Sequence, residues 1–286
     1  MVSSPLPFAS IENKFLRLDY LTTTGPRIVG LYAHGVEGNL LAETPHAHWP
    51  TPHGEFYLRG GHRLWIAPEN LFYVCPEDDL NVIEEKDRVI LRSAIDASGL
   101  EKELSFHLNE NCVHLIHRIT WHGDKPIEFA PWAITQLRLN GMAILPLSAS
   151  EGLTPNRNLV LWPYSQVNDE RFELHDDMIL LYGQGTTQAF KIGNLNKYGW
   201  IACMLGKALF VKRFSFSESQ SYPDMGCNVE AYVKDDCLEL ETLGPLTKLN
   251  PNESVTHEET WEVITDIEYA TTIESARAIR ARFSSK

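Results

Sequence analysis

Two glutamates near the C-terminal end, Glu239 and Glu241, have the residue type and spacing for acid–base chemistry. They lie in the segment Leu238–Thr242, where apolar and acidic residues alternate as in a β-strand. Because side chains two residues apart on a strand share a face, both carboxylates are expected on one face. A partly buried carboxylate can have a raised pKa and act as a base. We expect Glu241 to line a polar groove, whereas for Glu239 a solvated sheet face is the alternative.

A second set of candidates surrounds the pair Gly60-Gly61, which permits a sharp bend of the backbone. An aromatic face can stack on a sugar ring while charged groups bind the sugar hydroxyls. This segment therefore favours a sugar subsite over a plain loop with a core tryptophan. The candidate residues are Arg59, His62, Arg63, Trp65 and Glu69.

Further aromatic residues lie near polar residues in other segments of the sequence. Trp132 follows a proline, and Asp224 and Glu230 lie in and just after the segment Tyr222–Gly226. Each of these taken alone is typical of core packing beside a turn. Together with the segments above, they predict walls of one groove.

The histidines His46, His48 and His53 lie close together in the sequence and could support a metal ion. Flanking prolines instead indicate an irregular loop, and no recognised ligand spacing completes the set. We predict no metal and no organic cofactor.

The charge of the chain restricts its partners. The 286 residues include 25 basic and 38 acidic ones, giving a net charge of −13. This balance argues against nucleic acid and against anionic membrane surfaces. No apolar run is long enough for a membrane span, and residues 1–8 do not resemble a secretory signal. Five scattered cysteines predict reduced thiols in a cytoplasmic protein, and the oligomeric state is not predictable from the sequence.

Short strands separated by turns are expected to position these residues from one end of the chain to the other. Hydrophobic alternation recurs in segments such as Leu104–Leu108 and Val113–Trp121. Only the C-terminal tail predicts a helix, with a capping box at Thr271–Glu274. Serial strands without intervening helices favour an all-β fold, a large antiparallel β-sandwich. We expect that domain to span residues 8–265, with a helical tail at 266–286.

The C-terminal segments also resemble the end of galactose mutarotase-like (aldose epimerase-like) domains. In that family a Leu-Glu-Thr strand carries the catalytic base, and a Pro-Gly-Glu turn precedes the last strand. Here the strand contains Glu241, and the turn Pro251–Glu253 has Asn252 in place of glycine, a residue that also tolerates positive φ. The resemblance implies that family's β-supersandwich, a sugar substrate and a catalytic role for Glu241. It also implies that the region Arg59–Arg63 takes the place of the family's substrate-binding Asn-Arg element.

The sequence departs from the family at the catalytic acid. The family's acid lies in a His-x-Tyr-Phe-Asn motif, and the matching region here, Ala130–Thr135, has no histidine. Either His62 replaces the acid from another loop, or the protein binds sugars without reacting with them. In the family's reaction a base removes the proton of the anomeric hydroxyl while an acid protonates the ring oxygen.

Three functions therefore remain open from the sequence. The first is an aldose epimerase that uses Glu241 and His62. The second is a non-catalytic carbohydrate-binding protein with the same groove. The third is a glycoside hydrolase or lyase that pairs Glu241 with Glu69 or Glu230. In each case the expected partner is a small sugar or an oligosaccharide.

Overall fold

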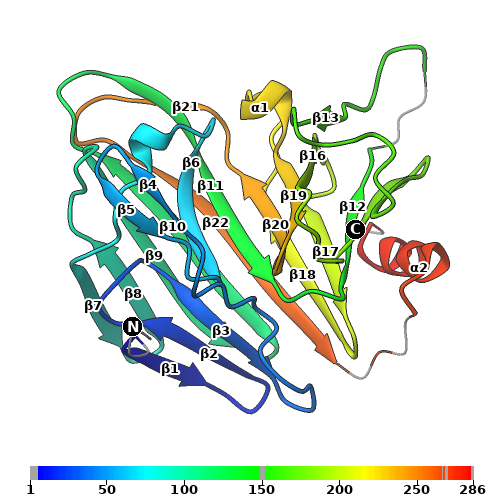
Figure 1. Cartoon of the computed structure of the whole chain (residues 1–286), viewed down its shortest axis with the longest axis horizontal. Coiled ribbons are helices and arrows are strands. Elements are labelled where there is room, and N and C mark those ends of the chain that lie inside the picture. Colours follow the sequence, from blue (N-terminus) through cyan, green and yellow to red (C-terminus); the bar gives the residue numbers. More distant parts are fainter. Residues whose placement is uncertain (1–5, 149–151, 266, 268–269, 285–286) are drawn as a thin grey trace.

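Short strands that follow one another along the chain assemble into two ten-stranded sheets that face each other (Figure 1). The computed structural model describes residues 6–148, 152–265, 267 and 270–284. Within this part of the chain, every pair of neighbouring strands is antiparallel. The predicted antiparallel β-sandwich is confirmed.

The first sheet, called the site sheet here, carries the glutamate strand near its middle. Its order is β1 (Phe8–Glu12), β2 (Leu16–Leu21), β3 (Ile28–Ala33), β6 (His62–Ala67), β11 (Ile127–Leu137), β20 (Cys237–Leu243), β19 (Val229–Lys234), β16 (Phe190–Asn194) and β13 (Val160–Leu161), with β21 (Thr247–Leu249) beside β11.

The second sheet packs against the inner face of the site sheet. Its order is β14 (Phe172–Leu174), β15 (Met178–Tyr182), β12 (Met142–Pro146), β17 (Trp200–Leu205), β18 (Ala208–Phe214), β22 (Ser254–Thr265), β10 (Cys112–Trp121), β9 (Leu100–Asn109), β8 (Arg88–Ser93) and β7 (Leu80–Glu85).

Three smaller elements complete the fold around these sheets. The strands β4 (His48–Thr51) and β5 (Gly54–Tyr57) form a separate hairpin, and η1 (Leu71–Tyr73) is a single 3₁₀ turn. The element α1 (Pro223–Gly226) is also one turn. Its second residue, Asp224, has a φ of 49°, so α1 is a tight bend and not a regular helix.

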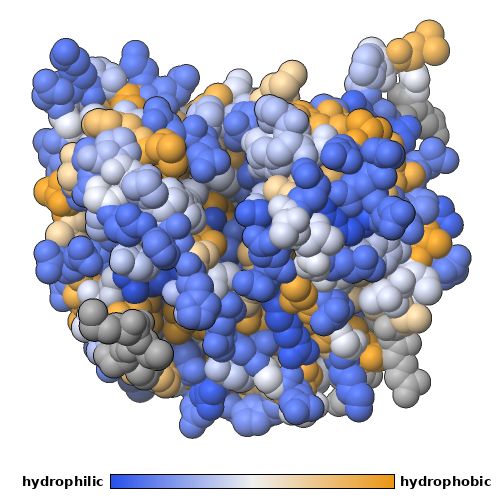
Figure 2. All heavy atoms as spheres, viewed as in Figure 1, coloured by the Kyte–Doolittle hydropathy of each residue, from blue (hydrophilic) through white to orange (hydrophobic). Residues whose placement is uncertain are grey.

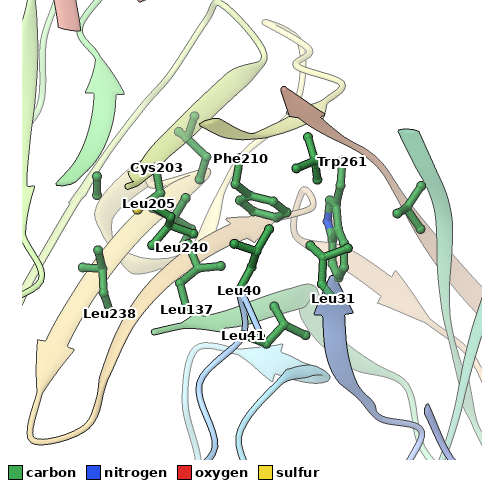
Figure 3. Close-up of a cluster of buried hydrophobic side chains, with 14 of the residues drawn as sticks. Leu31, Leu40, Leu41, Leu137, Cys203, Leu205, Phe210, Leu238, Leu240 and Trp261 are labelled. Carbon is green, nitrogen blue, oxygen red and sulfur yellow. The ribbon is translucent and has the colours of Figure 1, made fainter. Parts of the chain in front are cut away.

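The main core lies between the two sheets, where their apolar side chains meet (Figure 3). Leu238 and Leu240 of β20 point into this layer from the site sheet. Phe210 of β18 and Trp261 of β22 meet them from the second sheet, and all four side chains are fully buried. Because side chains alternate along a strand, the glutamates of β20 must point out of this layer.

The predicted C-terminal helix is present as α2 (Ile273–Phe283). Its buried side chains, among them Ile279 and Phe283, pack against Trp200 and neighbouring residues on the outer face of the second sheet. The N-cap is Thr272, whose hydroxyl accepts a hydrogen bond from the backbone N–H of Ser275, and not Thr271 as the capping-box pattern predicted.

The turn before β22 agrees with its sequence pattern, since Asn252 has a φ of 68°. All five cysteines have free thiols. The face of the molecule drawn in Figure 2 is mostly hydrophilic, with hydrophobic residues scattered among polar ones. In the described part of the chain, no helix combines the length and the hydropathy needed to cross a membrane.

Candidate functional site

The outer face of the site sheet brings acidic and basic side chains into one row. Glu241 of β20 pairs with Ile134 of β11 on one side and with Glu230 of β19 on the other. Ile134 in turn pairs with Arg63 of β6. Residues paired across a sheet share a face, so Arg63, Glu241 and Glu230 all point away from the core. Glu239 lies two residues from Glu241 and shares this face, as the alternation predicted.

Glu241 is fully buried, and two side chains contact its carboxylate. The indole Nε1 of Trp132 donates a hydrogen bond of 2.6 Å to its Oε2. The ammonium Nζ of Lys191 lies 2.9 Å from the same oxygen. The other oxygen, Oε1, has no hydrogen-bond partner among the described residues. The carboxylate is therefore fixed in position through one oxygen, while the other oxygen has no partner among the described residues.

Lys191 of β16 is the central cation of the site. Its ammonium also lies 2.7 Å from Glu230 Oε2 and rests 4.4 Å from the ring centre of Trp132 and 4.6 Å from that of Trp162. Burial alone would lower the pKa of Lys191, but Glu230 and Glu241 outweigh it and hold the pKa well above its usual value. Lys191 is thus a charged group at the pH of the cell.

Three acids around Lys191, namely Glu230, Asp224 and Glu239, have raised pKa values. Burial raises the pKa of Glu230 well above its usual value, and the nearby Glu241 adds to the effect. Burial also raises the pKa of Asp224 and of Glu239. A site that contains both an ionised pair and carboxyls with raised pKa values has groups to donate and to accept protons.

A second ion pair lies beside the first on the same face. A guanidinium nitrogen of Arg63 contacts Glu239 Oε1 at 3.3 Å, and the guanidinium lies over the Trp65 ring at 4.5 Å. Two other nitrogens of Arg63, together with Trp65 Nε1 and Gln136 Oε1, have no hydrogen-bond partner among the described residues. Such buried and unpaired polar atoms are suited to bind the hydroxyl groups of a ligand.

These side chains line a groove on the site sheet. Its larger compartment, of about 800 Å³, includes Arg63, Trp65 and Glu239. A smaller compartment of about 330 Å³ includes Trp162 and Asp224. Glu69, Trp132 and Lys191 line both compartments. Glu241 and Glu230 lie in the floor beneath them, because both are fully buried and in contact with Lys191.

The candidates from the sequence are thus only partly brought together. Arg63, Trp65, Glu69, Trp132 and Asp224 line the groove. Their roles as sugar ligands stay predictions. Arg59 is not among the lining residues, and its guanidinium instead lies 5.4 Å from the ring centre of Tyr57.

The expectation that His62 faces the groove with Glu241 is wrong. His62 directly precedes Arg63 on β6, so its side chain points to the opposite face, into the core. There its Nε2 lies 2.7 Å from His117 Nε2 and its Nδ1 lies 2.9 Å from Thr135 Oγ1. Its ring also contacts Trp261 of the second sheet. His62 therefore cannot act on a ligand held above Glu241.

A buried cation of the second sheet, Lys212, contacts the backbone of the site sheet beneath the groove. Lys212 Nζ donates hydrogen bonds to the carbonyl oxygens of Ala133 and Leu240, at 3.2 and 3.1 Å. It also pairs with Glu259 at 2.8 Å. Ala133 follows Trp132 and Leu240 precedes Glu241, so Lys212 binds the backbone beside both residues.

The three histidines His46, His48 and His53, whose sequence pattern offers little reason to combine them as a metal site, have separate surroundings. His48 pairs with Glu55 at 2.5 Å, and His53 Nε2 contacts the carbonyl oxygen of Phe72 at 2.9 Å. His46 lines the groove. The absence of a metal stays a prediction.

Among the described residues, one group of three is close enough together to hold a metal, namely His62, His117 and Glu259. Both ring nitrogens of each histidine lie within hydrogen-bonding distance of a protein partner. Glu259 is bound by Lys212 and by Trp261 Nε1. These ligand atoms are therefore already satisfied by hydrogen bonds and an ion pair.

Sequence reasoning missed several contributors to the site, Lys191 and Tyr232 among them. Lys191 is a single lysine in a strand, and it alternates with the core residues Phe190 and Ile192. That alternation was the one signal that could have placed Lys191 on the outer face. Tyr232 lines the larger compartment and alternates in the same way on β19.

Comparison with known proteins identifies the fold. No protein-family model and no curated protein matches the sequence. An Escherichia coli K12 protein provisionally assigned as an aldose 1-epimerase matches with a TM-score of 0.57 and 13% identity, over 91% of this chain and 99% of that one. A provisionally assigned mutarotase of Salmonella typhimurium matches with a TM-score of 0.59 and 10% identity, over 90% of each chain. A galactose mutarotase-like protein of Lactobacillus casei matches with a TM-score of 0.53 and 8% identity, over 90% and 100%. The chain therefore has the galactose mutarotase-like fold.

Proposed function

We propose that this protein binds a sugar in the groove and interconverts the anomers of that sugar by general acid–base catalysis. The observation that carries the proposal is the buried cluster of Lys191, Glu230 and Glu241 directly beneath an aromatic groove. Burying three ionisable groups in this way opposes folding, and strongly perturbed pKa values of this kind are typical of functional sites.

In this mechanism Glu241 accepts the proton of the anomeric hydroxyl through its unpaired Oε1. Asp224, with its raised pKa, is the acid that protonates the ring oxygen. The ring bond opens to give the free aldehyde, the aldehyde group rotates, and closure yields the other anomer. Because Lys191 lies above Glu241, its flexible stem must swing aside for the hydroxyl to reach the carboxylate.

The second candidate function is sugar binding without reaction. It is favoured by the full burial of Glu241 and by the ion pair that already engages one of its oxygens. Glycoside cleavage by Glu241 with Glu230 has less support. Both carboxylates contact one ammonium, which leaves no room for a sugar ring between them.

The test is anomer exchange of a panel of aldoses, measured by NMR saturation transfer, with binding measured by calorimetry. Glu241→Gln should lower the exchange rate by a factor on the order of 10² to 10⁴ and leave sugar binding largely intact. Glu258→Gln is the matched control, since this exposed residue lies on the outer face of the second sheet.

The outcomes separate the three functions. Binding by the wild type with exchange at the uncatalysed rate would make this a binding protein. New reducing ends released from a glycoside would indicate cleavage instead, with Glu69 as the remaining opposed carboxylate. Exchange by Glu241→Gln at the wild-type rate would remove Glu241 from the mechanism.

A further inference from the structure

The groove is longer than one sugar ring requires. Its compartments of about 800 and 330 Å³ share Glu69, Trp132 and Lys191, so they are adjacent. Pockets of about 300 to 1,000 Å³ typically hold drug-sized ligands, which are larger than a monosaccharide. The larger compartment alone therefore has space for more than the ring that would lie beside Lys191.

Aromatic side chains continue along the groove away from Lys191. Near the lysine, the ring centres of Trp132 and Trp162 lie 4.4 and 4.6 Å from its ammonium. Farther along, Trp49 of the hairpin β4–β5 lines the larger compartment and lies 6.4 Å from Trp65, between ring centres. Tyr164, which is 41% exposed, lines the same compartment from a loop. Aromatic surface thus extends well beyond the ionisable cluster and can stack on additional rings.

The charges of the groove disfavour an anionic ligand. The two cations nearest the cluster are already engaged, Lys191 with two glutamates and Arg63 with Glu239. Additional acids, including Asp224 and Asp236, line the compartments. The net charge of the chain, −13, has the same sign. A phosphate or carboxylate on the ligand would meet cations that already pair with glutamates, together with several further acids, which favours an uncharged ligand. The unpartnered nitrogens of Arg63 can donate hydrogen bonds to the hydroxyl groups of such a ligand.

We propose that the ligand is an uncharged oligosaccharide of two or more units, with its reducing-end ring beside Lys191 and the next ring against Trp49. This inference rests on the proposed function, because it assigns the substrate class of the same groove. It adds a second subsite, formed by the hairpin β4–β5, to the site around Glu241.

The test is a calorimetric series of neutral gluco-, galacto- and manno-saccharides of one, two and three units, with the matching uronates and sugar phosphates. For at least one neutral series, Kd should fall at least tenfold from one unit to two. The anionic analogues should bind more weakly than their neutral counterparts.

Two variants locate the second subsite. Trp49→Ala should lower the affinity for disaccharides by more than it lowers the affinity for monosaccharides, so that the gain from the second unit is lost. Trp49→Leu serves if Trp49→Ala fails to fold, because it keeps an apolar side chain against Phe56 and Trp65 but removes the indole face.

Failure of the inference is distinct from failure of the proposed function. Monosaccharides that bind and exchange as well as disaccharides would overturn the inference alone, as would tighter binding of an anionic analogue. If no sugar of any length binds, both the proposed function and the inference fall.

Discussion

Replacing Lys191 by methionine tests the ionisable cluster beneath the groove through the stability of the protein. The substitution keeps the length of the side chain but removes the ammonium that contacts Glu230 and Glu241. Both carboxyls are fully buried, so water cannot replace the lost contacts with the ammonium. The variant must therefore take up one additional proton or keep an uncompensated buried charge.

The magnitude follows from the cost of that proton. Protonating a carboxyl whose ordinary pKa is 4.5 costs about 3.4 kcal/mol at pH 7, at about 1.36 kcal/mol per pH unit. The same step costs only about 0.7 kcal/mol at pH 5. The folded-state pKa of such a carboxyl lies above its unfolded value, so its stabilisation is complete below pH 4.5 and is lost as the pH rises. The variant should thus be about 3 kcal/mol less stable than the wild type at pH 7 and nearly as stable at pH 5.

The measurement is urea unfolding of wild type and variant at both pH values. Combining Lys191→Met with Glu241→Gln should restore most of the loss at pH 7, because the double variant has one buried carboxyl fewer to accommodate without the ammonium. Lys197→Met is the control, since Lys197 pairs with Glu218 on the surface and should contribute at most about 1 kcal/mol. An equal loss at pH 5 and pH 7, or a loss as small as the control's, would refute this account of the cluster.

Three further predictions concern the rest of the fold. Burial lowers the pKa of His62, His117 and His257, the last to about 3, so these rings stay neutral in the folded state. Their stabilisation is complete above about pH 6.5 and is lost as the pH falls, so together they should lower the free energy of unfolding by up to about 4 kcal/mol per pH unit below pH 6, against the opposite contribution of carboxyls with raised pKa such as Glu230. His257→Gln should therefore lose less free energy of unfolding in urea than the wild type between pH 7 and pH 5, and an equal loss would contradict this. Leu240→Ala should cost about 2 to 5 kcal/mol in urea unfolding, because it opens a cavity in the core between the sheets, and a loss under 1 kcal/mol would argue against close packing there. Thr272→Ala should lower the stability of α2 by about 1 kcal/mol through loss of its N-cap, seen as faster amide exchange in the helix, whereas unchanged exchange would show that the cap is dispensable.

The fold and the face of the glutamates were predictable because both depend on local alternation. Glu239 and Glu241 lie on the outer face of β20 as the pattern of that strand required. His62 was misplaced because its segment was read as a bend around two glycines. Once His62–Ala67 is a strand, His62 and Arg63 cannot share a face.

The partners of the glutamates were not predictable from the sequence. Lys191 reaches Glu241 only because β16, β19 and β20 are neighbours in the sheet, and this order comes from the packing of the whole chain. The same holds for Lys212, whose role depends on contacts between the two sheets. Nothing in the local sequence of either lysine indicates which carboxylate it will meet.

The alternation along β20 has a consequence for how this protein can change during evolution. Glu239 and Glu241 belong to the groove, while Leu238 and Leu240 belong to the core, so residues with different structural roles alternate along one strand. A shift of the strand by a single residue would exchange the two sets and disrupt both folding and chemistry. New specificities should therefore arise by changes in the rim segments 44–49 and 187–189, while β20 itself stays constant. A library that randomises those rims offers a route to altered ligands that leaves the sandwich intact.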